Sequence, residues 1–221
     1  MSSDRPPQQP LSLPVILTGL VLMVLGVLAA RYVLSPHQQA SPLPANLKAT
    51  YLQDGKPITG FQLLDYDRHP FDASRFKGKW TFLFFGYTNC PDVCPTTLLV
   101  MKSVWAKLPA AAKAAPAPQL VFVSVDPDRD TPEKLKKYVT FYRPDFLGVT
   151  GNADQIDILT NQVGVLYGFD DDPDGNGYTV KHSAQIILVD PSGKERAVFS
   201  PPHKVDDIVR SFVEIRNYYK G

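Results

Sequence analysis

Cysteine is scarce in this chain of 221 residues, which contains only two. Methionine is scarce too, with three residues and no Met-rich stretch. A structural zinc site usually needs four protein donors, so two cysteines cannot form an all-thiolate site of that kind. The chain also lacks an excess of charge, because 23 basic residues face 22 acidic ones and the net charge is +1. That balance does not indicate a nucleic-acid surface, and no nucleic-acid partner is expected.

Both cysteines lie in one short segment, Cys90-Pro-Asp-Val-Cys94-Pro, directly after the apolar run Trp80–Tyr87. This order predicts a strand, then a turn that carries two thiols, then a helix. Four residues make about one helical turn, so both sulfurs can face the same way. Such a pair can close a disulfide or chelate one soft metal ion. The remainder of the sequence has to distinguish these two uses.

The N-terminal part lacks charge over a long stretch. Leu11–Ala30 is uncharged and rich in Leu and Val, and its length matches the roughly 20 residues that a helix needs to cross a membrane. We predict a short tail at residues 1–10, a transmembrane anchor at 11–34 and a Pro-containing linker at 35–49. A cleaved signal peptide is the alternative, although its apolar region is typically only about 7–15 residues long.

Residues 50–221 are numerous enough to form a full hydrophobic core. Two strand–helix units followed by a hairpin and a final helix predict an α/β sandwich of the thioredoxin type. Thr131, as a helix cap before a proline, and Gly164, as a helix stop, mark two of the boundaries. The Ala/Pro-rich segment Ala110–Pro118 is expected to be an exposed connection. The expected strands are Ile58–Asp65, Trp80–Tyr87, Leu120–Val125, Ser183–Val189 and Glu195–Phe199, and the expected helices are Pro95–Leu108, Thr131–Tyr142, Ala153–Val163 and Val205–Tyr219.

The two thiols are predicted to lie at the start of the helix that begins at Pro95. A helix N-terminus stabilises nearby anions, so we expect a lowered pKa for both Cys90 and Cys94. Thiolates are better nucleophiles and better metal ligands than thiols. A purely stabilising disulfide is the structural alternative, but a bridge that closes so small a loop adds little stability.

Among the four histidines, His182 has a predicted place beside the thiols. It stands at the start of the expected strand Ser183–Val189, which in this fold begins against the thiol-bearing loop. Thioredoxin-type redox proteins have a cis-proline there, whereas this chain has Lys181-His182-Ser183. An imidazole in place of the proline turns a thiol-exchange site into a three-ligand metal site. No function is assigned to the others, which are His37, His69 and His203.

Two thiolates and one imidazole form a soft, three-coordinate set that suits Cu(I). Cu(II) can also be held if a weak fourth ligand or a water completes the shell. Zinc would normally require a fourth donor. Copper is therefore the predicted ion, and Cys90, Cys94 and His182 are its candidate ligands.

Two motifs and the distal histidine together resemble the Sco/SenC proteins. The motifs are Gly86-Tyr-Thr-Asn-Cys-Pro-Asp-Val-Cys-Pro-Thr-Thr-Leu98 and Val123-Ser-Val-Asp-Pro-Asp-Arg-Asp-Thr-Pro132, and the histidine is His182. The resemblance covers about residues 50–220. It implies a membrane-anchored, thioredoxin-like copper protein in which the two cysteines and the histidine bind the metal. It also implies a role in assembling the binuclear CuA centre of cytochrome c oxidase.

The resemblance extends to Asp126 and Asp130, which match a pair of acids in the family. These acids are expected either to face the partner protein or to tune the metal site. The alternative is that they only cap and brace the turn before the helix at Thr131. Lys181 departs from the pattern, because family members often carry an acid before the histidine. That departure concerns the orientation of His182 and not its ability to bind a metal.

Two functions from different classes follow. The first is a copper metallochaperone whose partner is the copper-bearing subunit of cytochrome c oxidase, with other copper chaperones or thioredoxin-like reductants as further partners. The alternative is a thiol–disulfide reductase that keeps the partner's copper-binding cysteines reduced, through a mixed disulfide at Cys90 or Cys94. The expected location is a bacterial inner membrane with the domain in the periplasm, and the mitochondrial inner membrane is the alternative.

Two other patterns do not fit their motifs. Asp170–Gly175 has the spacing of an EF-hand, but Lys181 occupies the twelfth position, where calcium needs a bidentate Glu. Cys94-Pro-Thr96 is similar to the peroxide-reducing cysteine of peroxiredoxins, but Pro91 stands where those proteins carry threonine. Calcium binding is therefore not expected, and peroxidase activity is a third option that Pro91 disfavours.

Overall fold

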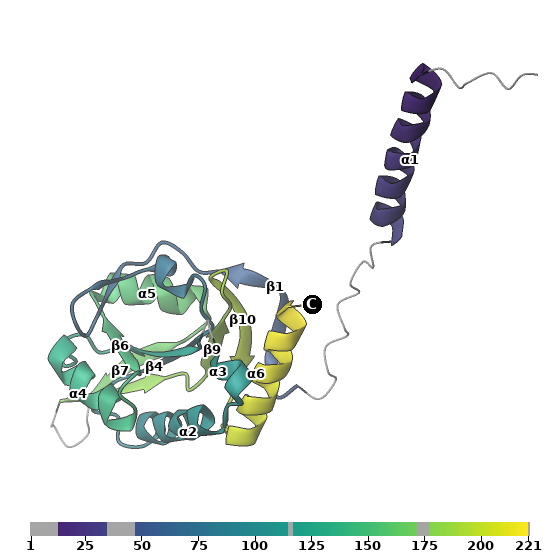
Figure 1. Cartoon of the computed structure of the whole chain (residues 1–221). Helices are drawn as coiled ribbons and strands as arrows, with labels where there is room; N and C mark the ends of the chain where they lie inside the picture. The colour runs from purple at the N-terminus through teal and green to yellow at the C-terminus, as the bar shows by residue number, and fades with distance from the viewer. Residues whose placement is uncertain (1–12, 35–46, 115–116, 172–176, 221) are drawn as a thin grey trace, which may run out of the picture. The chain divides into compact units, whose positions relative to one another are not determined.

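The computed structural model describes most of the chain (Figure 1). The described residues are 13–34, 47–114, 117–171 and 177–220. The predicted tail at 1–10, and the predicted linker as far as residue 46, lie outside these ranges.

The chain divides into two units, of which the second runs from Leu43 to Lys220. The first contains helix α1, Leu13–Leu34, which covers most of the predicted anchor. In the described ranges, no helix has both the length and the apolar character needed to cross a membrane. The transmembrane part of the prediction is therefore not confirmed.

An eight-stranded sheet forms the centre of the second unit, in the order β1-β10-β9-β4-β5-β6-β2-β3. Strands β4, β5 and β6 are parallel, and β9 joins β4 from the other side as an antiparallel strand. The strands of this sheet are β1 (Thr50–Pro57), β2 (Leu63–Asp65), β3 (Pro70–Phe71), β4 (Thr81–Gly86), β5 (Gln119–Ser124), β6 (Leu147–Thr150), β9 (Ile186–Val189) and β10 (Lys194–Phe199). A separate two-stranded sheet pairs β7 (Tyr167–Asp171) with β8 (Tyr178–His182).

Strand β4 is central because all six of its residues are buried, which is expected of a strand covered on both faces. Parallel strands have their carboxyl ends at the same edge of a sheet, so β4 and β5 place the segments that follow them side by side. Strand β9 runs the other way and therefore begins at that same edge. This edge collects the cysteine loop, the acids after β5 and the segment that precedes β9.

Helices cover both faces of the sheet (Figure 1). Helix α2 (Val93–Lys107) lies between α4 (Pro132–Tyr142) and α6 (Val205–Lys220), and α5 (Ala153–Gln162) covers the opposite face. Two short helices, η1 (Ala73–Phe76) and α3 (Ala110–Lys113), complete the unit. The four longer helices are those that the sequence predicted.

The boundaries of α4 and α5 follow the predicted signals. The side chain of Thr131 accepts a hydrogen bond from the backbone N–H of Lys134, and a proline occupies the first turn of α4. Helix α5 ends before Gly164, whose φ of 67° lies in the left-handed region that favours glycine. The thioredoxin-like α/β fold is thus confirmed.

Three predictions about secondary structure were wrong in detail. Within Ile58–Asp65 only the last three residues form a strand, and the edge strand β1 was missed because its alternation of polar and apolar residues is weak. The expected strand Ser183–Val189 begins only at Ile186. The segment Ala110–Pro118 contains the helix α3, and Ala112 packs into the core instead of facing solvent.

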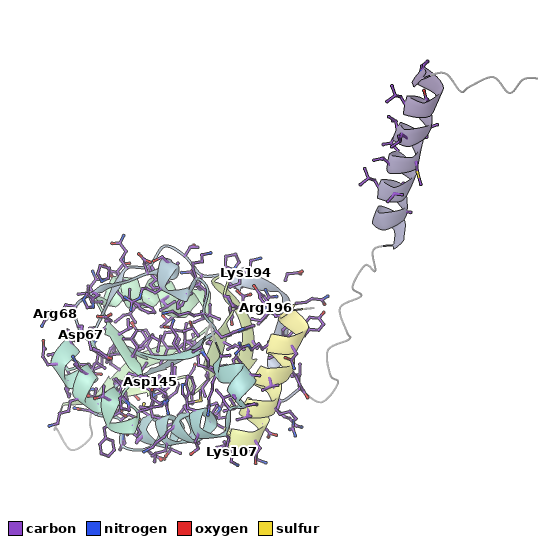
Figure 2. All side chains as sticks on the ribbon, viewed as in Figure 1. Asp67, Arg68, Lys107, Asp145, Lys194 and Arg196 are labelled. Atoms are coloured by element: carbon purple, nitrogen blue, oxygen red, sulfur yellow. The ribbon has the colours of Figure 1, made fainter. Side chains whose placement is uncertain are left out.

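A buried ion pair holds the end of the β9–β10 hairpin. Arg196, on β10 (Figure 2), donates from Nε and Nη2 to Oδ2 of Asp190 at 2.9 and 2.6 Å. Burial alone would raise the pKa of Asp190, but hydrogen bonds from Ser192 and Arg196 outweigh it and hold that pKa below its usual value. Arg196 also donates to the carbonyls of Leu52 and Gln53. One guanidinium therefore ties β1 to β10 and to the hairpin turn, a contact that no local pattern in the sequence reveals.

Candidate metal centre

The two cysteines lie where β4 leads into α2, as predicted, although the helix begins at Val93 and not at Pro95. The loop after β4 is fixed by Asp130, which accepts hydrogen bonds from the backbone N–H and the hydroxyl of Thr88 at 2.9 and 2.5 Å. Helix α2 then begins just before Cys94, so Cys90 precedes the helix and Cys94 lies in its first turn. The N–H of Cys94 points at Sγ of Cys90, with 3.4 Å between the two atoms. The helix N-terminus thus donates to one sulfur and carries the other.

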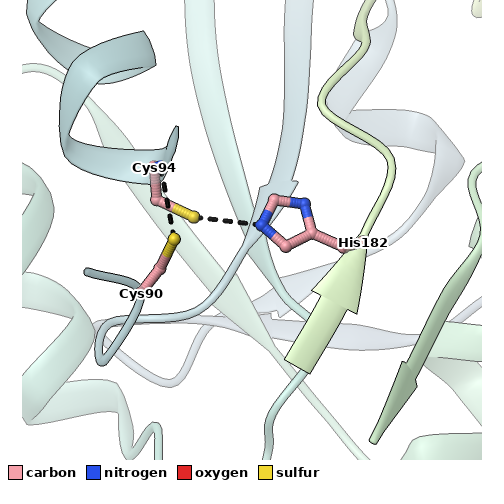
Figure 3. A group of neighbouring side chains, drawn as sticks. All are labelled: Cys90, Cys94 and His182. Atoms are coloured by element: carbon pink, nitrogen blue, oxygen red, sulfur yellow. Dashed lines mark hydrogen bonds between the residues drawn. The ribbon is translucent and has the colours of Figure 1, made fainter. Parts of the chain in front are cut away.

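His182 reaches the thiols from the two-stranded sheet. It is the last residue of β8, and not the residue next to β9 that the sequence predicted, because β9 begins only at Ile186. Its Nε2 lies 3.2 Å from Sγ of Cys94 (Figure 3). The predicted proximity is nevertheless confirmed, because the segment before β9 lies at the same sheet edge as the end of β4.

The backbone orients the imidazole. Nδ1 of His182 lies 3.1 Å from the carbonyl oxygen of Ser183, which can only accept, so we assign the ring proton to Nδ1. Nε2 then directs its lone pair toward the thiols. The side chain at 181 takes no part, because Lys181 is 79% exposed and pairs with Asp170. In a metal-binding histidine, the ring nitrogen that does not bind the metal usually donates to a carboxylate or a carbonyl. Here the Ser183 carbonyl accepts that hydrogen bond, so the departure at Lys181 does not affect the orientation of His182.

The three side chains form one compact donor group. In the described part of the chain it is the one cluster of His, Cys, Asp and Glu that could hold an ion, and its ligand atoms all lie within 4.8 Å of one another. Donors that bind one ion at about 2.0–2.3 Å lie up to about 4.6 Å apart, so small side-chain rotations suffice. Cys94 is fully buried and Cys90 is 9% exposed. The ring of His182 packs edge-on against Tyr87 and Phe84. Two sulfurs and an imidazole between apolar walls fit a soft ion such as copper.

The two thiols differ in acidity. A hydrogen bond from the Cys94 thiol and one from the backbone N–H of Cys94 outweigh burial and lower the pKa of Cys90 to about 4. The same sulfur–sulfur hydrogen bond and deeper burial raise the pKa of Cys94. The predicted lowering is therefore wrong for Cys94, because the pair shares one proton and Cys94 holds it.

This difference predicts how the metal-free, reduced chain is alkylated. Cys90 is expected to react with iodoacetamide at nearly the same rate at pH 6 and pH 8, because it is already a thiolate above about pH 4. An ordinary thiol of pKa about 8.5 would react roughly 50-fold or more faster at pH 8. Cys94 is expected to stay unmodified. Mass spectrometry of the two sites measures both rates, the urea-unfolded chain is the control, and a steep rise for folded Cys90 would contradict the shared proton.

Asp126 and Asp130 brace the site from within. Both are fully buried, so neither faces a partner, and the bracing alternative describes them. Asp130 holds the cysteine loop through Thr88. Asp126 accepts hydrogen bonds from Nε of Arg129 and from the hydroxyl of Tyr178, which begins the strand that ends at His182.

Gly86 leaves room for one of the sulfurs. A Cβ at this position would lie 2.6 Å from Sγ of Cys94 and 2.9 Å from Cε2 of Phe122, which is closer than side chains pack. Gly86→Ala is therefore expected to displace the thiol, to cost about 1–3 kcal/mol of stability and to weaken Cu(I) binding. Thermal unfolding and a Cu(I) titration measure both effects. Gly168→Ala, where an added Cβ meets nothing within 4 Å, is the control, and unchanged binding in Gly86→Ala would show that the sulfur position does not matter.

The other histidines do not join the centre. His69 is 70% exposed and lies beside Asp65, and Nε2 of His203 contacts the carbonyl of Ala184. His37 lies outside the described residues, as do residues 172–175 of the acidic segment.

The sequence did not reveal the roles of the Ser183 carbonyl and of Tyr178, because neither residue belongs to a motif. Gly86 does begin the first motif, and that was an available signal.

Fold and site together define a class: a thioredoxin-like protein in which two thiols at the start of a helix and one histidine form a soft-metal centre. The chain belongs to the SCO1/SenC family, whose model matches residues 50–217. The sequence-based identification is thereby confirmed.

Relatives and solved structures agree with this assignment. The chain is 35% identical to the "SCO2-like protein" of Rickettsia felis, over 79% of this chain and 83% of the relative. Its fold matches a crystal structure of Arabidopsis thaliana ScoI with copper bound, with a TM-score of 0.66 and 32% identity, over 73% of this chain and 99% of the other. It also matches Bradyrhizobium japonicum ScoI with copper bound, with a TM-score of 0.62 and 34% identity, over 73% and 99%.

Proposed function

We propose that this chain is a copper metallochaperone that supplies copper to the binuclear CuA centre of cytochrome c oxidase. The observation that carries the proposal is the compact Cys90, Cys94 and His182 donor group, within 4.8 Å and between apolar walls. Membership of the SCO1/SenC family and the copper-bound structures of two relatives support the choice of ion and of pathway. The partner is the copper-bearing oxidase subunit.

Cys90, Cys94 and His182 each supply one donor atom to the ion. Cys90 supplies a thiolate that already exists at neutral pH, Cys94 supplies a second after losing its proton, and His182 supplies Nε2. The bound copper is cargo, and its softness matches the two sulfurs. Release proceeds by ligand exchange, in which each donor of the acceptor replaces one donor of this chain. Cys90 is the more exposed of the two cysteines and His182 is only partly buried, so these two are the donors that an acceptor meets first.

Copper titration of the reduced, full-length chain tests the binding step, with a competing Cu(I) chelator to measure affinity. One copper per chain is expected. The transfer step is tested by mixing the loaded chain with the purified, metal-free CuA-bearing domain of an oxidase subunit and measuring the copper content of each protein after separation. Copper that stays on this chain at equilibrium would contradict a delivery role, even if binding is tight.

A thiol–disulfide reductase is the second candidate, and the unequal thiols favour it. A low-pKa Cys90 beside a protonated Cys94 can attack a partner's disulfide, and Cys94 can then resolve the mixed disulfide. The partner gains two electrons, one proton from Cys94 and one from solvent, this chain becomes the disulfide, and a thioredoxin-like dithiol restores it. Measuring the reduction potential of the pair and turnover on a disulfide substrate tests this role. A potential too low for such donors to restore the dithiol would eliminate a catalytic cycle.

We also propose a location, from the sequence alone. The uncharged stretch Leu11–Ala30 and the family resemblance favour attachment to a bacterial inner membrane with residues 50–221 in the periplasm, and the mitochondrial inner membrane is the alternative. Protease treatment of spheroplasts tests the bacterial arrangement. A domain that survives protease until the cells are lysed would place it in the cytoplasm instead.

A further inference from the structure

The hairpin of β7 and β8 carries His182 but is not part of the main sheet. Among the described residues, its two strands pair only with each other. An isolated two-stranded hairpin is marginally stable in water. Side-chain contacts with the body of the domain must therefore hold His182 in place, and the cysteines lie on that body.

A compact polar cluster makes such a contact at Tyr178, the first residue of β8. The guanidinium carbon of Arg129 lies 3.7 Å from the centre of the Tyr178 ring. Nη1 of Arg129 donates to the Tyr178 carbonyl oxygen at 2.8 Å, and its Nε donates to Oδ2 of Asp126 at 2.5 Å. The Tyr178 hydroxyl donates to Oδ1 of the same carboxylate at 2.7 Å. The three residues thus form a closed ring of charge-assisted hydrogen bonds.

This ring connects two separate parts of the structure. Asp126 is fully buried just beyond β5, so it belongs to the body of the domain. Arg129 is three-quarters buried, so its stacking on Tyr178 is partly shielded from water, where a cation–π contact is stronger than at an exposed site. The hydrogen bond to Asp126 raises the pKa of Tyr178 to about 12, so the hydroxyl remains a donor at neutral pH.

The ring is also close to the histidine. Tyr178 and His182 are four residues apart on one strand, so their side chains lie on the same face of the hairpin. The guanidinium of Arg129 lies 5.7 Å from the centre of the Tyr87 ring, and that ring packs edge-on against His182 at 6.1 Å. Arg129 therefore supports the imidazole along two paths, through β8 and through Tyr87.

We propose that Arg129 and Tyr178 are positioning residues, which latch the β7–β8 hairpin to Asp126 and hold the His182 imidazole against Cys94. Neither residue touches the ion. They act on copper affinity only through His182, and the proposal rests on the proposed copper-binding function. Loss of the latch loosens the Tyr178 end of the hairpin, which Val180 and the Tyr167–Asp157 hydrogen bond still attach to the domain, so the imidazole spends less time at the thiols.

A double-mutant cycle in the full-length chain tests this dependence. Arg129→Met keeps much of the side-chain length but removes the guanidinium. With a competing chelator, it is expected to lower Cu(I) affinity about 10–100-fold, the range found when groups that support a metal ligand are lost. In a His182→Ala background the same change is expected to alter affinity less than about twofold, because the path through the imidazole is gone. An equal loss in both backgrounds, or no loss in the wild-type background, would overturn the proposal.

Conservative variants separate positioning from general stability. Tyr178→Phe keeps the ring and its stacking but loses the bond to Asp126, so it is expected to lose less affinity than Arg129→Met. Arg129→Lys keeps the charge but cannot reproduce the three contacts, so it should not restore affinity. Arg210→Met, which breaks the exposed Arg210–Asp207 pair on α6, is the matched control and is expected to bind copper as the wild type does. If Arg129→Lys bound copper as tightly as the wild type, only the charge at this position would matter, and the latch would be refuted.

Hydrogen exchange on the metal-free chain gives a readout without copper. Amides of residues 178–183 are expected to exchange faster in Arg129→Met than in the wild type, while β4 and β5 keep their protection. If the wild-type chain binds copper but does not deliver it, the metallochaperone role fails and the latch stands. If it binds no copper, the copper function fails and hydrogen exchange still decides the latch. Unchanged exchange in the hairpin would refute it.

Discussion

Replacing His182 by alanine is expected to lower the Cu(I) affinity of the reduced chain by more than about 100-fold. The imidazole supplies one of the three donors, 3.2 Å from Sγ of Cys94, and losing even a supporting residue of a metal ligand typically costs 10–100-fold. The metal-free variant should still fold, since the imidazole contributes only its contacts with the Ser183 carbonyl and Cys94 and edge-on packing against two aromatic side chains. A Cu(I) titration against a chelator measures the loss, and circular dichroism checks the fold.

His69→Ala is the matched control, because this histidine is exposed, lies beside Asp65 and does not belong to the donor group. It is expected to bind copper as the wild type does. Equal affinity in His182→Ala and in the wild type would show that the imidazole is not a ligand. The variant also separates the two functions, because disulfide exchange needs Cys90 and Cys94 but no imidazole. A variant that loses copper and keeps reductase turnover would assign the two activities to different parts of one site.

Asp190→Ala is expected to destabilise the domain by about 3–5 kcal/mol, because it leaves the Arg196 guanidinium buried without its carboxylate. The change also removes the acceptor for the backbone N–H of Ser192 in the hairpin turn. For a domain of this size, each kcal/mol lowers the unfolding midpoint by about 2–4 °C, so a fall of about 6–20 °C should be seen by calorimetry. Because the folded pKa of Asp190 is depressed, its contribution is present above the ordinary aspartate pKa and is lost as pH falls through the folded value.

Asp67→Ala tests whether the stability loss expected for Asp190→Ala comes from burial of the ion pair. Asp67 pairs with Lys136 at 2.6 Å, but both side chains are about half exposed, and Asp67 lies on the opposite side of the domain from Arg196 (Figure 2). Exposed pairs contribute little, so the midpoint should hardly move. Similar losses from both variants would mean that the buried pair has no special role in joining β1, β10 and the turn.

The sequence predicted the fold where local patterns are strong. The apolar run of β4, the cap at Thr131 and the stop at Gly164 each depend on neighbouring residues, and each was confirmed. Strand β1 was missed because it is held by β10 and by Arg196, which lies more than 140 residues further along the chain. Pairing over that distance leaves no local signal.

The metal site also has features that the sequence could predict and features that it could not. Cys90, Cys94 and His182 were predicted from residue type, spacing and resemblance, and the structure brings them together. What orients them could not be predicted, because the Ser183 carbonyl is a backbone group that every residue has. The unequal pKa values of the thiols were also out of reach, since they depend on which sulfur is more deeply buried and which donates to the other.

That inequality has a consequence for the stoichiometry of protons. At neutral pH one sulfur of the pair is ionised and the other carries a proton, so an ion that binds both must displace about one proton into solvent. In calorimetry, the measured heat should vary with the ionisation enthalpy of the buffer, with a slope near one. Affinity should rise about tenfold for each unit of pH in this range. A fall of one pH unit in the compartment would then reduce copper loading as much as a tenfold fall in the concentration of available copper.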